Sequence, residues 1–194
     1  MNNPNIKNIN IEILSNNWYT LRKVTFDFLQ KNGTWQSQNR EAYDRGNGAA
    51  ILLYNPDNKT VILTRQFRMP TYLNGNTSGM MIEACAGLLD ADNPEDCIKK
   101  ETQEETGYVI HDVQKVFEVY MSPGSVTEML YFFVAEYHQD LLKNEGGGVA
   151  NEEEIEVLEL DLRQAMTMIK TGEIKDAKTI MLLQYVWIEG LIKY

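Results

Sequence analysis

Three glutamates in one short segment are the residues of this chain most able to do chemistry. Glu101, Glu104 and Glu105 follow Asn93 and a proline and precede Gly107, a pattern typical of a capped helix that a glycine ends. In such a helix the three carboxylates lie on one side, where like charges repel. A hard divalent cation removes this repulsion, and ligands that are all oxygen suit Mg²⁺ better than Zn²⁺. The spacing therefore indicates a magnesium site, and magnesium in turn indicates phosphates.

A glutamate-rich helix end is more often a solvated surface, so the glutamates by themselves favour a structural interpretation. The segment Gly87-Leu88-Leu89-Asp90 changes this balance, because a loop there turns backbone carbonyls and amides toward the same helix. Together these residues resemble the Nudix box, Gly-x5-Glu-x7-Arg-Glu-U-x-Glu-Glu-x-Gly-U, in which U is a bulky apolar residue. The positions that match in register are Glu101, Glu104, Glu105, Gly107 and Tyr108, and Gly87 supplies the glycine of the box one residue closer to Glu101 than the pattern has it.

Three positions depart from this box. Asp92 stands in place of its first glutamate, Lys100 in place of its arginine, and Thr102 in place of its apolar residue. The family's arginine steadies the neighbouring glutamate with a planar fork of donors, which an ammonium cannot reproduce. The departure therefore concerns the support of the metal ligands, and it removes none of them.

The resemblance implies an α/β fold, namely the Nudix α/β/α sandwich with a mixed sheet, and hydrolysis assisted by Mg²⁺, for which Mn²⁺ is a substitute. The metal ligands that it implies are the Ala86 carbonyl, Glu101, Glu105 and Glu153. Its implied catalytic residues are Glu153, Glu105 and Glu104. Glu153 follows a glycine run at the place where related enzymes supply a carboxylate that closes over the diphosphate, and the adjacent Glu152 is the next choice.

Two further segments resemble the nucleoside-diphosphosugar branch of the family. They are Arg65-Gln66-Phe67-Arg68 before the box and the Ser122-Pro123-Gly124 loop after it, which carries an acidic residue. A strand-end arginine is ordinarily plain surface charge, a tryptophan ordinarily packs, and a lysine is ordinarily solvated. Within this branch, the expected substrate contacts are Trp18, Arg40, Glu41, Arg68, Gly87, Leu88, Glu128, Glu152 and Lys178.

The branch implies cleavage of the pyrophosphate bond of a nucleoside diphosphate sugar. Overall the chain is most similar to bacterial members that act on GDP-mannose, which makes GMP and mannose 1-phosphate the expected products. Two alternatives remain open. Hydrolysis of ADP-ribose uses the same Ser-Pro-Gly loop, and a sensor that binds nucleotide sugars without cleaving them is favoured only by Asp92 and Lys100.

Composition restricts the other function classes. The chain has 194 residues with 43% hydrophobic and 24% charged residues, which is ordinary for a globular protein. Its net charge of −10 argues against nucleic acid and anionic membrane as partners. The beginning of the sequence lacks a secretory signal, no run is long enough to span a membrane, and the two cysteines have no His partner or metal-ligand spacing. We therefore expect a cytoplasmic protein.

Periodicity and turn residues predict a small N-terminal antiparallel β subdomain over residues 1–45 and a Nudix domain over residues 46–194. The predicted strands cover residues 9–15, 18–29, 35–45, 49–54, 60–67, 113–120, 129–137 and 157–160, and residues 80–86 lead into the loop of the box. Predicted helices cover residues 94–106, the stretch from 162 to Gly172, and the chain from Asp176 onward. The last helix, which is apolar nearly all round, and the separate N-terminal strands are compatible with a homodimer and equally with a helix packed wholly within its own subunit. Because Nudix enzymes that act on nucleotide sugars are commonly dimers with exchanged N-terminal strands, the resemblance implies such a homodimer.

Overall fold

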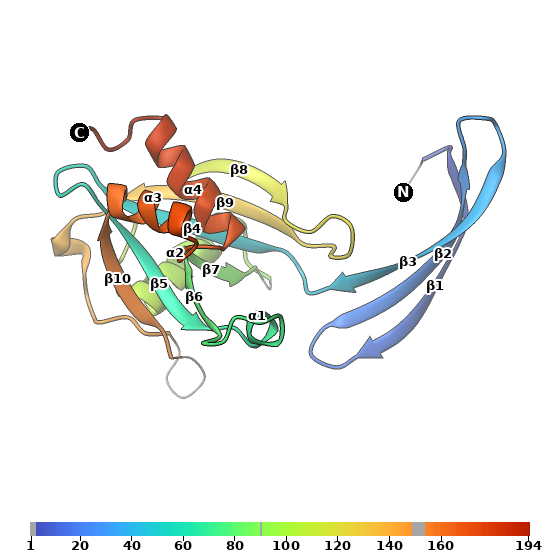
Figure 1. The fold of residues 1–194 in the computed structure, drawn as a ribbon, viewed down its shortest axis with the longest axis horizontal. Coiled ribbons are helices and arrows are strands. Elements are labelled where there is room, and N and C mark those ends of the chain that lie inside the picture. Colours follow the sequence, from blue (N-terminus) through green and yellow to red (C-terminus); the bar gives the residue numbers. More distant parts are fainter. Residues whose placement is uncertain (1–2, 90, 149–153) are drawn as a thin grey trace. The chain divides into compact units, whose positions relative to one another are not determined.

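The chain folds into two compact units, which Figure 1 shows in a computed structural model describing residues 3–89, 91–148 and 154–194. The first unit joins Met1–Asn47 to the segment Tyr120–Met129, and the second joins Gly48–Val119 to Leu130–Tyr194. The division predicted at residue 45 assigns Tyr120–Met129 to the second part, whereas its contacts group it with the N-terminal strands.

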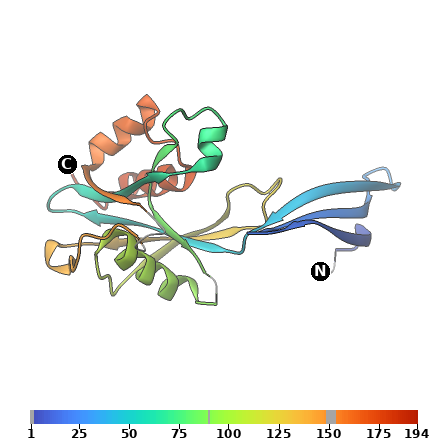
Figure 2. The ribbon, with the colours of Figure 1, turned by 90° about the horizontal axis from the view of Figure 1, so that it is seen from below.

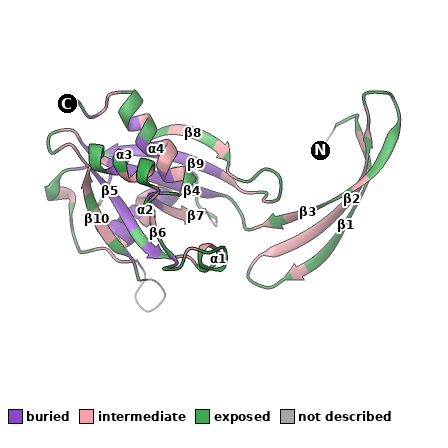
Figure 3. Ribbon diagram, viewed as in Figure 1, coloured by how far each residue is buried: buried purple, intermediate pink, exposed green. Residues whose placement is uncertain are grey.

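The first unit is built on a three-stranded antiparallel sheet of β1 (Ile6–Asn16), β2 (Thr20–Leu29) and β3 (Trp35–Asp44), in that order. These strands were predicted and are confirmed. None of the described residues in 3–47 and 120–129 is buried, which Figure 3 shows as the absence of purple from these strands. Apolar side chains on β1 are consequently exposed, among them Ile9, Ile11 and Ile13.

The main sheet of the second unit contains seven strands. Five follow the order β10-β5-β4-β9-β8, and two shorter strands join it at its centre. β4 and β9 run parallel, whereas β5 is antiparallel to both of its long neighbours, β4 and β10. The strands are β4 (Gly48–Asn55), β5 (Thr60–Phe67), β6 (Met80–Glu83), β7 (Cys85–Leu88), β8 (Gln114–Tyr120), β9 (Met129–Glu136) and β10 (Glu156–Asp161).

The two short strands fill a fork between β4 and β5. β4 pairs with β5 only through Leu53–Asn55, while its first half, Gly48–Ile51, pairs with β7. The second half of β5 pairs with β6. Residues 80–86, for which the sequence predicts only a lead into the loop of the box, thus belong to two strands, because the chain changes partner at Ala84. There the Ala84 N–H donates to the Thr179 hydroxyl at 2.6 Å, in place of a strand carbonyl.

Helices cover both faces of this sheet. Figure 2 shows α2 (Pro94–Thr106) on one side, and α3 (Leu162–Thr171) and α4 (Ala177–Ile188) on the other. The fold is thus a mixed sheet between helices, as predicted. Two short helices, α1 (Met69–Leu73) and the 3₁₀ turn Gln139–Leu141, were not predicted, because so few residues carry no periodic pattern. No helix in the described ranges has the length and apolar character that crossing a bilayer requires.

The core of the second unit lies where α2 packs on β4 and β7. Its members are almost all apolar and include Ile51, Leu53, Ile62, Ile98, Phe133 and Tyr137. The last helix packs on both β4 and α3, yet Trp187 and Ile188 near its end remain exposed. β4 is therefore buried on two faces, which gives the strands and helices around it a rigid support.

Candidate active site

The acidic helix α2 begins and ends as its sequence predicts. The Asn93 side chain accepts hydrogen bonds from the N–H groups of Glu95 (3.1 Å) and Asp96 (3.0 Å), and Pro94 follows in the first turn. Gly107 ends the helix in the left-handed conformation with φ +78°. Both predicted ends are confirmed, so the spacing of the three glutamates on this helix is that of a regular α-helix.

Glu101 lies directly against the backbone of β7. A Cβ atom added to Gly87 would overlap the Cγ, Cδ and Oε1 atoms of Glu101. The next glutamate along this side of the helix, Glu105, is buried with 3% of its surface exposed. Ala86, whose carbonyl was predicted as a metal ligand, precedes Gly87 on the same strand. The structure thus brings the helix carboxylates and the β7 backbone together.

The electrostatics of a nearby thiol support this arrangement. Burial raises the pKa of Cys85 well above its usual value, and the negative charges of Glu105 and Glu101 raise it further. Cys97, the other cysteine, is also buried, and its thiol donates to the Leu88 carbonyl at 3.2 Å. The two thiols therefore pack as small apolar groups beneath the acidic cluster.

Two of the three residues that depart from the Nudix box, Lys100 and Thr102, have plain structural roles. Lys100 is exposed, and its Nζ lies 3.8 Å from a carboxylate oxygen of Glu104, which is a loose pair compared with an arginine fork. Thr102 is fully buried and donates its hydroxyl to the Ile98 carbonyl at 2.6 Å. The helix itself therefore satisfies this polar group, so that threonine fits where the family has an apolar residue.

A glycine loop is attached to the end of the acidic helix. The N–H groups of Gly147 and Gly148 donate to the carbonyls of Glu105 (2.9 Å) and Glu104 (3.1 Å). A cavity of about 320 Å³ lies at this junction, lined by Lys100, Gln103, Glu104, Asn144, Gly146 and Gly148. The next residues of the loop include the predicted Glu152 and Glu153, which lie outside the described residues. The loop is thus anchored beside the acidic helix just before these two glutamates.

The described part of the site fits a hard divalent cation in its donor chemistry. Glu101 and Glu105 supply carboxylate oxygens, and Ala86 supplies a backbone carbonyl on the strand against which Glu101 lies. Within residues 3–89, 91–148 and 154–194, no group of three His, Cys, Asp or Glu side chains is arranged to hold a metal. A set that includes Ala86 therefore depends on backbone oxygen as well as on carboxylates.

Two predicted substrate contacts, Arg68 and Lys178, meet at a residue that sequence reasoning missed. Both donate to the carboxylate of Glu83 at the end of β6, which is buried with 6% of its side chain exposed. Burial alone would raise the pKa of Glu83, but the charges and hydrogen bonds of Lys178 and Arg68 outweigh it and lower this pKa to about 2. A glutamate inside the apolar run 80–86 was the available signal, because a buried carboxylate requires a cation.

The remaining predicted contacts belong to the first unit. Trp18 is 86% exposed at the turn before β2, and its ring packs edge-on to Tyr19. Arg40 is exposed on β3, and its guanidinium donates to the Asn39 carbonyl. Its neighbour Glu41 is also exposed. Their roles as substrate contacts stay predictions.

Glu128, the last of these predicted contacts, is held by an ion pair. It lies 3.3 Å from Arg45, whose guanidinium in turn lies over the ring of Tyr19. The 120–129 segment that carries Glu128 is joined to the end of β3, because the Tyr43 N–H donates to Ser125 and its carbonyl accepts from Thr127. Its role as a substrate contact also stays a prediction.

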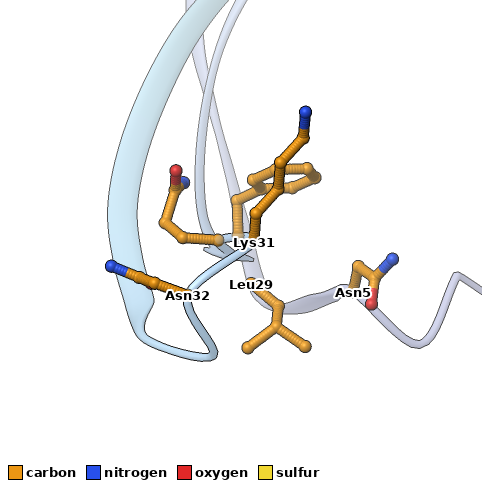
Figure 4. Close-up of a pocket in the computed structure, with 6 residues that line it drawn as sticks. Asn5, Leu29, Lys31 and Asn32 are labelled. Atoms are coloured by element: carbon orange, nitrogen blue, oxygen red, sulfur yellow. The ribbon is translucent and has the colours of Figure 1, made fainter.

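A larger cavity, of about 600 Å³, lies at one end of the first unit. Asn5, Leu29, Lys31 and Asn32 line it together with Phe28 and Gln30, as Figure 4 shows. None of the predicted site residues belongs to this set. Its lining has no acidic residue and a single charge, so it lacks the groups that chemistry on a diphosphate requires.

The sequence matches two known family models. The family described as "GDP-mannose pyrophosphatase NudK N-terminal domain" matches residues 5–43, and the NUDIX domain matches residues 44–183. A protein of Yersinia enterocolitica named GDP-mannose pyrophosphatase is 60% identical over 97% of this chain and 98% of its own length. A protein of the same name from Citrobacter koseri is 58% identical over 93% of this chain and 94% of its own length.

A solved structure entitled "Crystal structure of ADP compounds hydrolase" has the same fold. It superposes with a TM-score of 0.70 over 95% of each chain at 20% sequence identity. Nudix hydrolases generally use a divalent metal, and carboxylate and carbonyl oxygens of the kind present on α2 and β7 suit such an ion. The match over residues 44–183, together with relatives of 58–60% identity over nearly the whole chain, shows that this chain belongs to the Nudix hydrolase family.

Proposed function

We propose that this chain hydrolyses the pyrophosphate bond of a nucleoside diphosphate sugar, with GDP-mannose as substrate and GMP and mannose 1-phosphate as products. The observation that carries the proposal is the carboxylate of Glu101 lying on the Gly87 backbone, next to the buried Glu105. The relatives named GDP-mannose pyrophosphatase support this choice of base and sugar, because the identity of 58–60% extends over both units.

The proposed cofactor is Mg²⁺, with Mn²⁺ as a substitute, held by Glu101, Glu105, Glu153 and the Ala86 carbonyl. When bound, a divalent ion supplies charge that neutralises the two phosphates and acidifies water. The helix α2 fixes the spacing of its glutamates, and the contact with Gly87 fixes the position of the Glu101 carboxylate. These residues therefore orient the diphosphate for in-line attack, which is the main source of rate in phosphoryl transfer.

Proton transfer is assigned to the acidic residues beside this cluster. In the proposed reaction water forms a new bond to one phosphorus, its proton passes to Glu153, and the bridging P–O bond breaks to release the second phosphate. Glu152 is the alternative base. Glu104 is half-buried next to the glycine loop and is proposed to assist through its charge.

Substrate binding is assigned to Gly87, Leu88, Arg68 and Lys178 of the second unit and, in the first, to Trp18, Arg40, Glu41 and Glu128. The two cations suit a diphosphate, whose charge they partly neutralise. We also propose that residues 1–45 and 46–194 act as two domains in a cytoplasmic homodimer whose N-terminal strands are exchanged. The exposed apolar side chains on β1 support an additional partner for that sheet.

The test is to incubate the purified protein with Mg²⁺ and GDP-mannose and to separate the products by HPLC. Release of GMP and mannose 1-phosphate in equal amounts is the expected result. Release of GDP and mannose would mean that the glycosidic bond is cleaved, and would contradict the proposal. A parallel reaction with ADP-ribose serves as the control for specificity. A clear preference for it would make ADP-ribose the substrate, with the same hydrolysis of a pyrophosphate bond.

A further inference from the structure

Glu83 stands at a junction of three elements. It is the last residue of β6, opposite Thr64 in the register with β5, and its carboxylate is buried. Arg68 lies immediately after β5, at the start of α1, and Lys178 is in the first turn of α4. Side chains that are 15 and 95 residues away in the sequence thus converge on one carboxylate.

The bonds at this junction fix the direction of each cation. Arg68 donates from Nε to one carboxylate oxygen of Glu83 (3.1 Å) and from Nη2 to the other (2.9 Å). Lys178 donates to the second oxygen at 2.9 Å and also lies 3.1 Å from Asp176. Asp176 is itself fixed, because its carboxylate accepts from the backbone of Thr179 as the cap of α4. The four side chains form a network whose formal charge is zero.

The bonds of Arg68 to Glu83 use one side of the arginine. A fork that uses Nε and Nη2 occupies one edge of the planar guanidinium, and no hydrogen bond from a described residue uses the other edge, which carries Nη1 and suits a second anion. Arg68 is 40% exposed at its side chain, compared with 13% for Lys178 and 6% for Glu83. The network is therefore closed on the inside by Glu83, and its exposed edge belongs to Arg68.

We infer that Glu83 is a positioning residue, which holds Arg68 and Lys178 in place for the diphosphate of the substrate without touching the substrate itself; this inference rests on the proposed function. Arginine and lysine lose considerable rotamer freedom when a ligand orders them. Because Glu83 orders them beforehand, the ligand meets cations that already have their binding geometry. Without Glu83 two like charges would lie side by side, and each would turn away from the other.

The test is the variant Glu83→Gln, which keeps the size of the side chain and removes its charge. Its amide must present a donor to Arg68 or Lys178, which are themselves only donors. We expect KM for GDP-mannose to rise about tenfold with a smaller change in kcat, since ordering one long side chain on binding costs up to about a tenfold loss of affinity. Glu156→Gln is the matched control, because it removes the charge of an exposed carboxylate that pairs with Arg65, on the strand β5 that ends just before Arg68. It should leave KM and kcat unchanged.

A double variant separates positioning from a general effect on the fold. If Glu83 acts through Arg68, the double variant of Glu83→Gln and Arg68→Lys should lose clearly less kcat/KM than the product of the fold-losses of the two single variants. Full multiplication of the two losses, or an unchanged KM in a folded Glu83→Gln protein, would overturn the inference. If the wild type itself gives no GMP, the proposed function fails instead.

A second measurement does not depend on turnover or on the Glu83→Gln variant. In ¹⁵N NMR spectra of the wild-type protein, the Nε–H of Arg68 should exchange with solvent at least about tenfold more slowly than that of Arg65, whose partner Glu156 is exposed. The Arg68 signal is assigned by its absence from Arg68→Lys. Equal exchange rates for the two arginines would show that Glu83 does not hold Arg68, and would overturn the inference whatever the substrate.

Discussion

The carboxylate of Glu101 occupies the space where any side chain at Gly87 would begin. Gly87 has no positive φ, so its need for glycine comes from this contact alone and not from backbone strain. The glycine of the Nudix box and its glutamate are therefore two halves of one packing requirement. A larger residue in place of Gly87 should therefore displace the carboxylate of Glu101.

We accordingly predict that Gly87→Ala disables the site while the protein stays folded. The added methyl group displaces the Glu101 carboxylate, and misplacing a group beside a metal costs about 10–100-fold in metal affinity. The measurement is turnover of GDP-mannose as a function of Mg²⁺ concentration, in which the half-saturating concentration should rise. Gly124→Ala is the control, since no atom lies within 4 Å of a Cβ there and activity should not change. Equal Mg²⁺ dependence of both variants would contradict the prediction.

Removing one charge from the acidic helix should abolish most of the activity. For Glu101→Gln and Glu105→Gln we expect turnover to fall by about 100-fold or more, because the metal site contributes several kcal/mol of charge stabilisation. Circular dichroism should show an unchanged helix content. Glu95→Gln in the first turn of the same helix pairs only with Lys99 at the surface, and it should retain normal turnover. Near-normal activity of either site variant would mean that α2 is not the metal helix.

Acid should weaken the fold through Glu83. Its pKa falls from 4.5 to about 2 on folding, so its ionised form stabilises the protein above pH 4.5, and this contribution is lost as the pH falls toward 2. The shift corresponds to on the order of 3 kcal/mol. Urea unfolding of the wild type and of Glu83→Gln between pH 7 and pH 2.5 tests this prediction. The difference in stability between them should shrink as the pH falls, and a constant difference would contradict it.

The bond between Ala84 and Thr179 should contribute to stability. Thr179→Val removes the hydroxyl that accepts from the buried Ala84 N–H, and an unsatisfied buried donor costs about 1–3 kcal/mol. Thr102→Val is the control, because that hydroxyl donates to a carbonyl within its own helix and valine has a similar shape. In thermal unfolding, the free energy of unfolding of Thr179→Val should be clearly lower than that of the wild type, and that of Thr102→Val should lie within about 1 kcal/mol of the wild-type value. Equal losses would contradict the assigned role.

Local signals in the sequence predicted the acidic helix well. Asn93, Pro94 and Gly107 act within a few residues of the backbone groups that they satisfy, so their effect can be read without tertiary structure. The long strands were predicted for a similar reason, since alternation and turn residues are local. The resemblance to the box then selected the carboxylates that we propose as metal ligands.

Features set by distant residues were not predictable in this way. The strand break at Ala84 depends on Thr179, which is 95 residues away, and nothing in the run Met80–Ala86 marks the change of partner. Glu83 did carry a local signal, as a carboxylate inside an apolar run, but its two cationic partners could not be read from the sequence. Arg68 and Lys178 were each selected as substrate contacts, but that they share one carboxylate follows only from the packing of β5, β6 and α4.

The change of strand partner at Ala84 also constrains the number of residues in this segment. Glu83, which anchors the cations, and Ala86, which offers its carbonyl beside the acidic helix, are separated by only two residues of extended chain. One inserted residue would move these groups apart by about 3.3 Å and turn the following side chains to the opposite face of the sheet. A surface turn such as residues 30–34 can change its length without such an effect, whereas in this segment the count of residues matters as much as their chemistry.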